Sequence, residues 1–178
     1  ADVIKTGNIN DTHPPLYNIL IFIFVKITGL SEYAIRLLSS LFGVLSVFSL
    51  YILAKKIFSE TEALIASSLM LSTWSLVLVN QYARGYSLLL FTSILTMIFL
   101  YDFIDALDKG RNIKKPAFLY AISAVLCIYT HYFGLVLTVS EFLFLILTEL
   151  KYFKRISLLY GVIFLLYIPW LPFITPRY

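Results

Sequence analysis

Three short polar clusters interrupt a chain that is otherwise strongly apolar, and their residue types suit contact with a phosphate or a hydroxyl group. They lie at residues 11–15 (Asp-Thr-His-Pro-Pro), 81–86 (Gln-Tyr-Ala-Arg-Gly-Tyr) and 129–134 (Tyr-Thr-His-Tyr-Phe-Gly). Arginine offers phosphate a permanent charge and a planar fork of donors, and histidine exchanges protons near neutral pH. The clusters therefore predict a site for a charged ligand that carries phosphate.

The first cluster pairs a carboxylate, Asp11, with an imidazole, His13, directly before Pro14 and Pro15. Proline at the first position of a helix fits a helix start, so Asp11 or His13 could simply cap that helix. The stiff proline pair would also fix the direction of both side chains, as a binding site requires. Asp11 and His13 are then candidates for binding a divalent ion, orienting an acceptor hydroxyl or contacting a phosphate.

The second cluster contributes Gln81, Arg84 and Tyr86, and the third contributes His131 and Tyr132. Arg84 is a candidate phosphate ligand, and its alternative role is that of an interfacial arginine that reaches toward water. His131 and Tyr132 occupy a tight turn between two apolar runs. There they either contact the ligand or pack in an aromatic belt at the membrane interface.

Two further charged residues have two interpretations each. Arg36 is either an anion contact or an anchor at the start of an apolar run. Glu141 lies inside an apolar run, where a charge costs roughly 2.5–3.5 kcal/mol on insertion scales. We therefore expect Glu141 to have a buried polar partner or a water-filled cavity, the alternative being a protonated carboxyl bonded to its own helix. Three other acidic residues should form an ordinary solvated helix end beside Lys109: Asp102, Asp105 and Asp108.

Composition places these clusters in a membrane. The chain is 60% hydrophobic and only 13% charged, with a mean hydropathy of +0.88, and 178 residues cannot bury that much apolar surface in a soluble core. The net charge of +4 resides in short loops, which indicates membrane topology and no nucleic-acid binding. A single cysteine, Cys127, excludes an internal disulfide and a cysteine-based metal cage.

Six apolar runs fit transmembrane helices, which need about 20 mostly apolar residues each. Basic loops follow the first, third and fifth runs, so the positive-inside rule places these loops in the cytoplasm. The turns at 81–85 and 130–132 then face outward. We predict an all-α, multi-pass membrane protein with one domain and six transmembrane helices, at residues 35–58, 63–79, 86–107, 116–129, 133–150 and 157–174.

A further apolar stretch, residues 14–28, is predicted to lie on the outer surface and not to cross. The run 35–58 must begin outside to end at the basic loop, so a crossing at 14–28 would move His13 to the cytoplasmic side. The stretch is also short, and Lys26 near its end favours an interface. Residues 1–33 would thus be an extracytoplasmic loop with an interfacial helix, and residues 34–178 the transmembrane bundle.

Four motifs occur here in the order found in the glycosyltransferases that use polyprenyl-phosphate sugars. They are Asp-Thr-His-Pro-Pro-Leu-Tyr, Ala-Ile-Arg-Leu with Leu-Phe-Gly-Val-Leu, Gln-Tyr-Ala-Arg-Gly-Tyr-Ser and Tyr-Thr-His-Tyr-Phe-Gly, beginning at residues 11, 34, 41, 81 and 129. Over nearly its whole length the chain resembles the superfamily of protein O-mannosyltransferases and lipid A aminoarabinose transferases, which is family 39-like and has the GT-C membrane fold.

The resemblance implies an enzyme of the cell membrane whose active face is extracytoplasmic. It would move a sugar from a polyprenyl- or dolichyl-phosphate carrier to a hydroxyl of a lipid, glycan or protein acceptor, usually with inversion. His13 and Arg84 would lie near the lipid phosphate and Asp11 in the same cavity, where cations offset the charge that the departing phosphate gains. No cofactor is implied, and a divalent metal at Asp11 and His13 is left open.

The chain departs from the family pattern at two positions. The family commonly has an Asp-Glu pair after a first transmembrane helix, and neither precedes Asp11 here, so we expect a fragment whose catalytic aspartate lies upstream of Ala1. Asp2 and Asp11 are the alternatives within the chain, with Asp11 the candidate of the two, and the catalytic residue is therefore unknown. Tyr82 stands where the family often has glutamate. A carrier or flippase for lipid-linked saccharides and a non-catalytic membrane subunit are the alternative functions.

Overall fold

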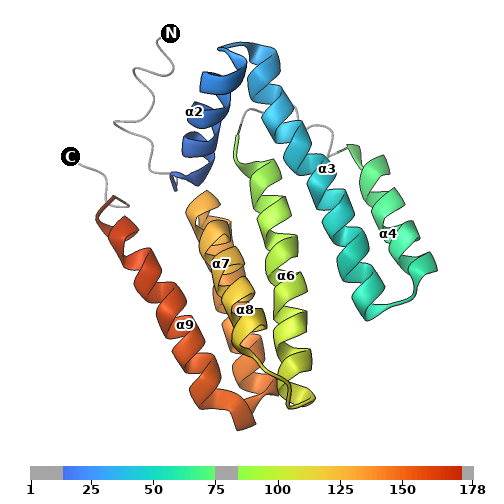
Figure 1. Cartoon of the computed structure of the whole chain (residues 1–178), viewed down its shortest axis with the longest axis vertical. Helices are drawn as coiled ribbons and strands as arrows, with labels where there is room; N and C mark the ends of the chain where they lie inside the picture. Colours follow the sequence, from blue (N-terminus) through green and yellow to red (C-terminus); the bar gives the residue numbers. More distant parts are fainter. Residues whose placement is uncertain (1–13, 75–83, 174–178) are drawn as a thin grey trace.

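The computed structural model describes residues 14–74 and 84–173, which are helical apart from short turns (Figure 1). This confirms the predicted all-α class. The described helices are α2 (Leu16–Thr28), α3 (Glu32–Ile57), α4 (Glu60–Ser72), α6 (Tyr86–Asp108), α7 (Lys114–Thr130), α8 (Tyr132–Thr148) and α9 (Phe153–Tyr167), with 3-10 helices η1 (Leu150–Tyr152) and η2 (Ile168–Phe173).

Three of the described helical segments are long and apolar enough to cross a bilayer, namely Glu32–Ile57, Tyr86–Asp108 and Leu150–Pro172. Helices α7 and α8 have 17 residues each, or about 26 Å at 1.5 Å per residue, slightly less than a bilayer core. The predicted run 63–79 extends beyond the described part of α4. The described residues therefore contain three candidate spans, and the total of six stays a prediction.

The helix boundaries follow local sequence signals. Gly29 ends α2 with a positive φ of 86°, and the Ser31 hydroxyl accepts a hydrogen bond from the Ala34 N–H at 3.1 Å to begin α3. Helix α2 thus ends at Thr28, the last residue of the predicted apolar stretch 14–28. Helix α4 begins three residues before the predicted 63, because the Glu62 carboxylate accepts a bond from the Ser59 N–H at 2.7 Å. Helix α9 likewise begins earlier than predicted, since the basic stretch before 157 is itself helical.

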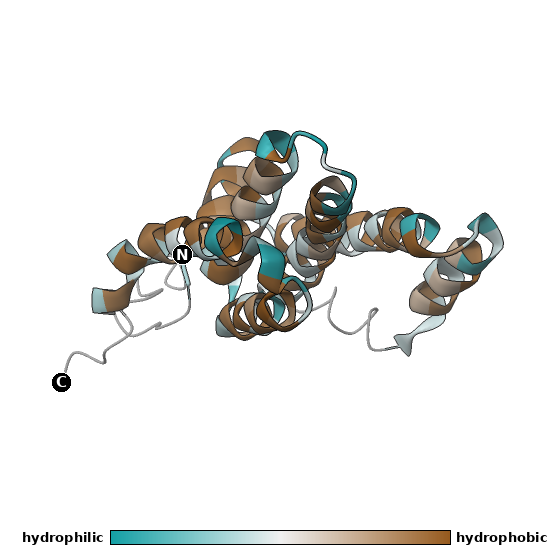
Figure 2. Cartoon of the chain, turned by 90° about the horizontal axis from the view of Figure 1, so that it is seen from below, coloured by the Kyte–Doolittle hydropathy of each residue, from teal (hydrophilic) through white to brown (hydrophobic). Residues whose placement is uncertain are grey.

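Helix α6 lies in the middle of the bundle, with α3 on one side and α7 on the other (Figure 1). The larger core fills the space among α6, α7, α8 and α9, around Phe103, Tyr120, Leu145 and Ile156. A smaller core joins α3 to α6. The outer surface is apolar, and hydrophilic residues gather at helix ends and turns (Figure 2). This distribution matches a bundle surrounded by lipid.

Helix α2 lies at one end of the bundle, beside the beginning of α3 (Figure 1). Its first turn is fixed by Tyr17, whose hydroxyl shares a hydrogen bond of 2.8 Å with the Ser39 hydroxyl of α3. From there α2 packs along the beginning of α3, beyond the start of α6 and the end of α7. That α2 lies along the outer membrane surface stays a prediction.

Candidate functional site

The start of α2, which directly follows the first polar cluster, meets the described parts of the second and third clusters at one end of the bundle. A Cβ on Gly85 would lie 3.3 Å from the Tyr17 Cβ and 3.6 Å from the Thr130 Cγ2, so the starts of α2 and α6 touch the end of α7. The ring centroids of Tyr86 and His131 are 5.5 Å apart. These five residues, called the rim below, bring together clusters that are far apart in sequence. The rim was the central expectation from the sequence.

The entrance to α2 is held by buried groups. Pro14 is fully buried and Tyr17 is 5% exposed. Burial raises the pKa of the Tyr17 hydroxyl above its ordinary value, while its bond to Ser39 acts in the opposite direction. The hydroxyl therefore stays protonated at neutral pH. Pro14 and Tyr17 therefore fix the start of α2 at this end of the bundle.

His131 has a structural role that the sequence suggested only as one alternative. Its Nδ1 accepts a hydrogen bond of 3.2 Å from the Phe133 N–H and so caps α8. Its ring stacks on the Phe133 ring at 5.1 Å and lies edge-on to Tyr132 at 6.4 Å. Because Nδ1 is the acceptor, the proton of neutral His131 must reside on Nε2. The cap thus fixes both the tautomer and the direction of the ring.

Arg84 lies directly beside the rim and is exposed to solvent. It forms no ion pair with any residue in the described ranges 14–74 and 84–173. Gly85 lets the chain beside Arg84 come close to Tyr17, because an added Cβ would lie only 3.3 Å from the Tyr17 Cβ. A permanent cation is therefore presented at the convergence of three helices.

Arg36 is placed differently from Arg84. It lies one turn before Ser39, on the part of α3 that pairs with α2, and forms an i,i+4 ion pair of 2.5 Å with Glu32. Both partners are at least half exposed, so the pair contributes little to stability. The predicted roles of Arg36 were anchor or anion contact, and the ion pair with Glu32 is the contact that the structure provides.

Three predicted site residues, Asp11, His13 and Gln81, lie outside the described residues. The proposed metal ligands Asp11 and His13 are among them. Within the described part of the chain, no group of three or more His, Cys, Asp or Glu side chains is arranged to hold a metal ion. The roles predicted for these three residues therefore stay predictions.

The expected catalytic aspartate is likewise untested. The structure describes the chain from Pro14 onward, so Ala1 lies outside the described residues as well. The expectation that the base lies upstream of Ala1 therefore stays a prediction, and so does the weaker assignment to Asp11.

Glu141 has the buried polar partner that its position in an apolar run predicted. It is 6% exposed, and its Oε2 accepts a hydrogen bond of 2.8 Å from the Tyr120 hydroxyl. The Tyr120 hydroxyl is also 2.5 Å from that of Tyr160, so the cluster joins α7, α8 and α9. Neither tyrosine was identified from the sequence. Tyr120 lies 21 residues before Glu141 and Tyr160 lies 19 residues after it, so no local sequence pattern indicates these contacts.

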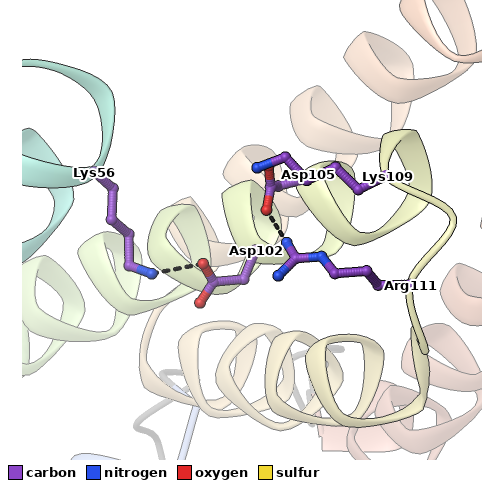
Figure 3. Close-up of polar contacts among 5 residues, drawn as sticks. All are labelled: Lys56, Asp102, Asp105, Lys109 and Arg111. Atoms are coloured by element: carbon purple, nitrogen blue, oxygen red, sulfur yellow. Dashed lines mark hydrogen bonds and ion pairs between the residues drawn. The ribbon is translucent and has the colours of Figure 1, made fainter.

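The opposite end of the bundle is charged. This basic end comprises residues 55–62, 102–115 and 149–155. Lys56 of α3 donates to Asp102 of α6 at 2.6 Å, and Lys109 and Arg111 both pair with Asp105 (Figure 3). The prediction of an ordinary solvated helix end was incomplete. These acidic groups link α3 to α6, and Asp108 links α6 to the start of the last helical segment through Lys151.

A helical bundle with apolar spans, an aromatic rim at one end and ion pairs at the other defines a multi-pass membrane protein. Its sequence matches the family model for dolichyl-phosphate-mannose-protein mannosyltransferases over residues 12–173. This range is most of the chain, which therefore belongs to that family and to the GT-C class, as the four motifs predicted. No curated protein and no solved structure matches it. The chain is thus a membrane glycosyltransferase domain of the type that uses lipid-phosphate sugars.

Proposed function

We propose that the rim receives the phosphate of a polyprenyl- or dolichyl-phosphate sugar and that the sugar is transferred there to an acceptor hydroxyl. The observation that carries the proposal is the convergence of α2, α6 and α7 beside the exposed cation Arg84. The same end carries aromatic rings from Tyr86 and His131, which suit contact with a sugar or an isoprenoid chain. Lipid, glycan and protein all remain candidate acceptors.

Arg84 would stabilise the charge that the carrier phosphate gains as the sugar departs. During transfer the carrier changes from a phosphate diester to a monoester, and a fixed guanidinium opposite the new charge lowers the barrier. Asp11, His13 and Gln81 would complete the site from the segments that adjoin Pro14 and Arg84. The general base is assigned to none of the described residues.

The proposed site is extracytoplasmic. The basic end is the cytoplasmic end by the positive-inside rule, and the rim lies at the other end of the same helices. Phe133 at the rim is 65% exposed, and Lys154 at the basic end is exposed as well. The sole cysteine, Cys127, is buried, so a thiol reagent should label a cysteine introduced at either of these two positions without labelling Cys127. In intact cells an impermeant thiol reagent should label Phe133→Cys and spare Lys154→Cys, and the reverse pattern would overturn the orientation.

Activity is tested with the full chain in membrane vesicles that receive radiolabelled dolichyl-phosphate mannose. The variant Arg84→Ala should lower transfer about a hundredfold or more, as loss of one donor to a developing anion commonly does. Arg155→Ala is the matched control, because Arg155 is an exposed arginine at the opposite end. Equal rates for Arg84→Ala and wild type would remove Arg84 from the phosphate role. Movement of dolichyl-phosphate mannose across the vesicle membrane without any sugar transfer would instead support the alternative function as a carrier.

A further inference from the structure

We propose that the basic end holds the headgroup of an anionic phospholipid in a hollow between α6 and α7. The hollow has a volume of about 610 Å³ and is bounded by the end of α6, the turn after it and the first turns of α7. Arg111, Asn112 and Lys115 line its polar part. This site lies at the opposite end from the rim and is independent of the reaction proposed there.

The charge around the hollow is positive after the local ion pairs are counted. Two carboxylates are present, and both are already engaged, Asp102 by Lys56 at 2.6 Å and Asp105 by Lys109 and Arg111 (Figure 3). Lys115 forms no ion pair with any described residue. A guanidinium has five N–H donors, and Arg111 uses one nitrogen on Asp105. The hollow therefore retains cationic donors for an anion.

Asn112 adds an oriented neutral donor. Its Oδ1 accepts a hydrogen bond of 3.0 Å from the Lys114 N–H in the turn that begins α7. Because the oxygen is the acceptor in this bond, the Nδ2 group remains as a donor of two hydrogens. An amide N–H beside two cations suits the oxygen atoms of a phosphate diester.

The remaining lining favours a lipid over free phosphate. Ala106, Pro116 and Leu119 form the apolar part of the hollow. Further along α7, Phe118 and Ile122 are 63% and 43% exposed and continue an apolar surface away from the charged end. A ligand that fits both parts has a negative headgroup and hydrocarbon chains. Basic pockets between transmembrane helices on the cytoplasmic side are suited to anionic lipid headgroups.

The test uses the full chain in detergent, titrated with phosphatidylglycerol or phosphatidylcholine while thermal unfolding is followed. Phosphatidylglycerol should raise Tm and phosphatidylcholine should not. The double variant Arg111→Gln/Lys115→Gln should bind about thirtyfold more weakly, since each basic side chain near an anionic lipid contributes about fivefold. The matched control is Lys154→Gln/Arg155→Gln, which removes the same charge from the same end outside the hollow.

Each outcome bears on the proposal. Equal weakening by the two double variants would show general surface attraction and overturn a defined site. If inorganic phosphate raises Tm as much as phosphatidylglycerol does, the hollow is a site for free phosphate, and the proposal of a lipid ligand is overturned. If the Arg111 substitution prevents folding, Lys115→Gln and Asn112→Ala break no ion pair and should each still weaken phosphatidylglycerol binding. Unchanged binding in both of these variants would also overturn the proposal.

Discussion

The two ends of the bundle are built from different interactions. At the rim, contacts depend on size and shape, as in the close approach of Gly85 to Tyr17 and Thr130 and the stacking of His131. At the basic end, exposed side chains form ion pairs such as Lys56–Asp102. Close packing restricts the rim to one arrangement, while solvated ion pairs tolerate movement. A reacting centre needs the first kind of construction, and a membrane anchor needs only the second.

The largest structural effect should come from Gly134→Ala, near the rim. An added Cβ would lie 2.3 Å from the backbone oxygen of Cys127, so the turn between α7 and α8 must shift. Overpacking of this kind costs about 1–3 kcal/mol and here would displace His131 from its capping position. Thermal unfolding in detergent measures the loss. Gly161→Ala is the control, since its Cβ would meet nothing within 4 Å and alanine favours a helix. Equal destabilisation of both variants would refute the close contact at Gly134.

A second prediction concerns the buried cluster between the two ends. Glu141→Ala should cost about 1–3 kcal/mol, because the buried Tyr120 hydroxyl loses the accepting carboxylate and keeps only the Tyr160 hydroxyl as a neighbour. Glu141→Gln should cost less, since an amide oxygen can still accept that bond. Unfolding of the purified variants in detergent gives both values. If alanine and glutamine are equally destabilising, the Tyr120 bond is not the source of the loss.

How much of this could be predicted from the sequence depends on the range of the interaction. Gly29 and Ser31 mark the boundary between α2 and α3 through local signals, and hydropathy identifies the apolar runs. Charge parity and the motifs predicted that the clusters share one end. Contacts across the bundle could not be predicted, because the bonds that Tyr120 makes to Glu141 and Tyr160 depend on helix packing. The ion pair of Lys56 with Asp102, 46 residues away, is a further example.

A smaller effect is expected at the attachment of α2. Tyr17→Phe removes the bond to Ser39 and should cost about 0.5–1.5 kcal/mol, since the ring still packs against Gly85. Tyr33→Phe is the control, because Tyr33 is 88% exposed. Hydrogen exchange of the α2 amides should rise in Tyr17→Phe only. A rise in both variants, or in neither, would show that this bond does not hold α2 to the rim.

The smallest effect is a pH dependence at the start of α4, on the basic end. The bond from the Ser59 N–H holds the pKa of Glu62 below its ordinary range, and the bond from Lys55 does the same for Glu60. A lowered pKa in the folded state means that this stabilisation is complete above the ordinary value of about 4.3 and is lost as pH falls through the lower, folded value. Wild type should therefore exceed Glu62→Gln in Tm near neutral pH, and the difference should shrink in acid.

The stabilising contributions of Glu60 and Glu62 should differ in their dependence on salt. The Glu60–Lys55 pair is an exposed ion pair of 3.1 Å and is screened at about 1 M salt, whereas the bond between Glu62 and Ser59 includes no cation. The Tm difference for Glu60→Gln should thus shrink more in high salt than the difference for Glu62→Gln. A common response of both variants to salt would mean that helix α4 is held by long-range charge and not by its capping bond. The start of α4 would then lack a capping bond of the kind that His131 gives α8.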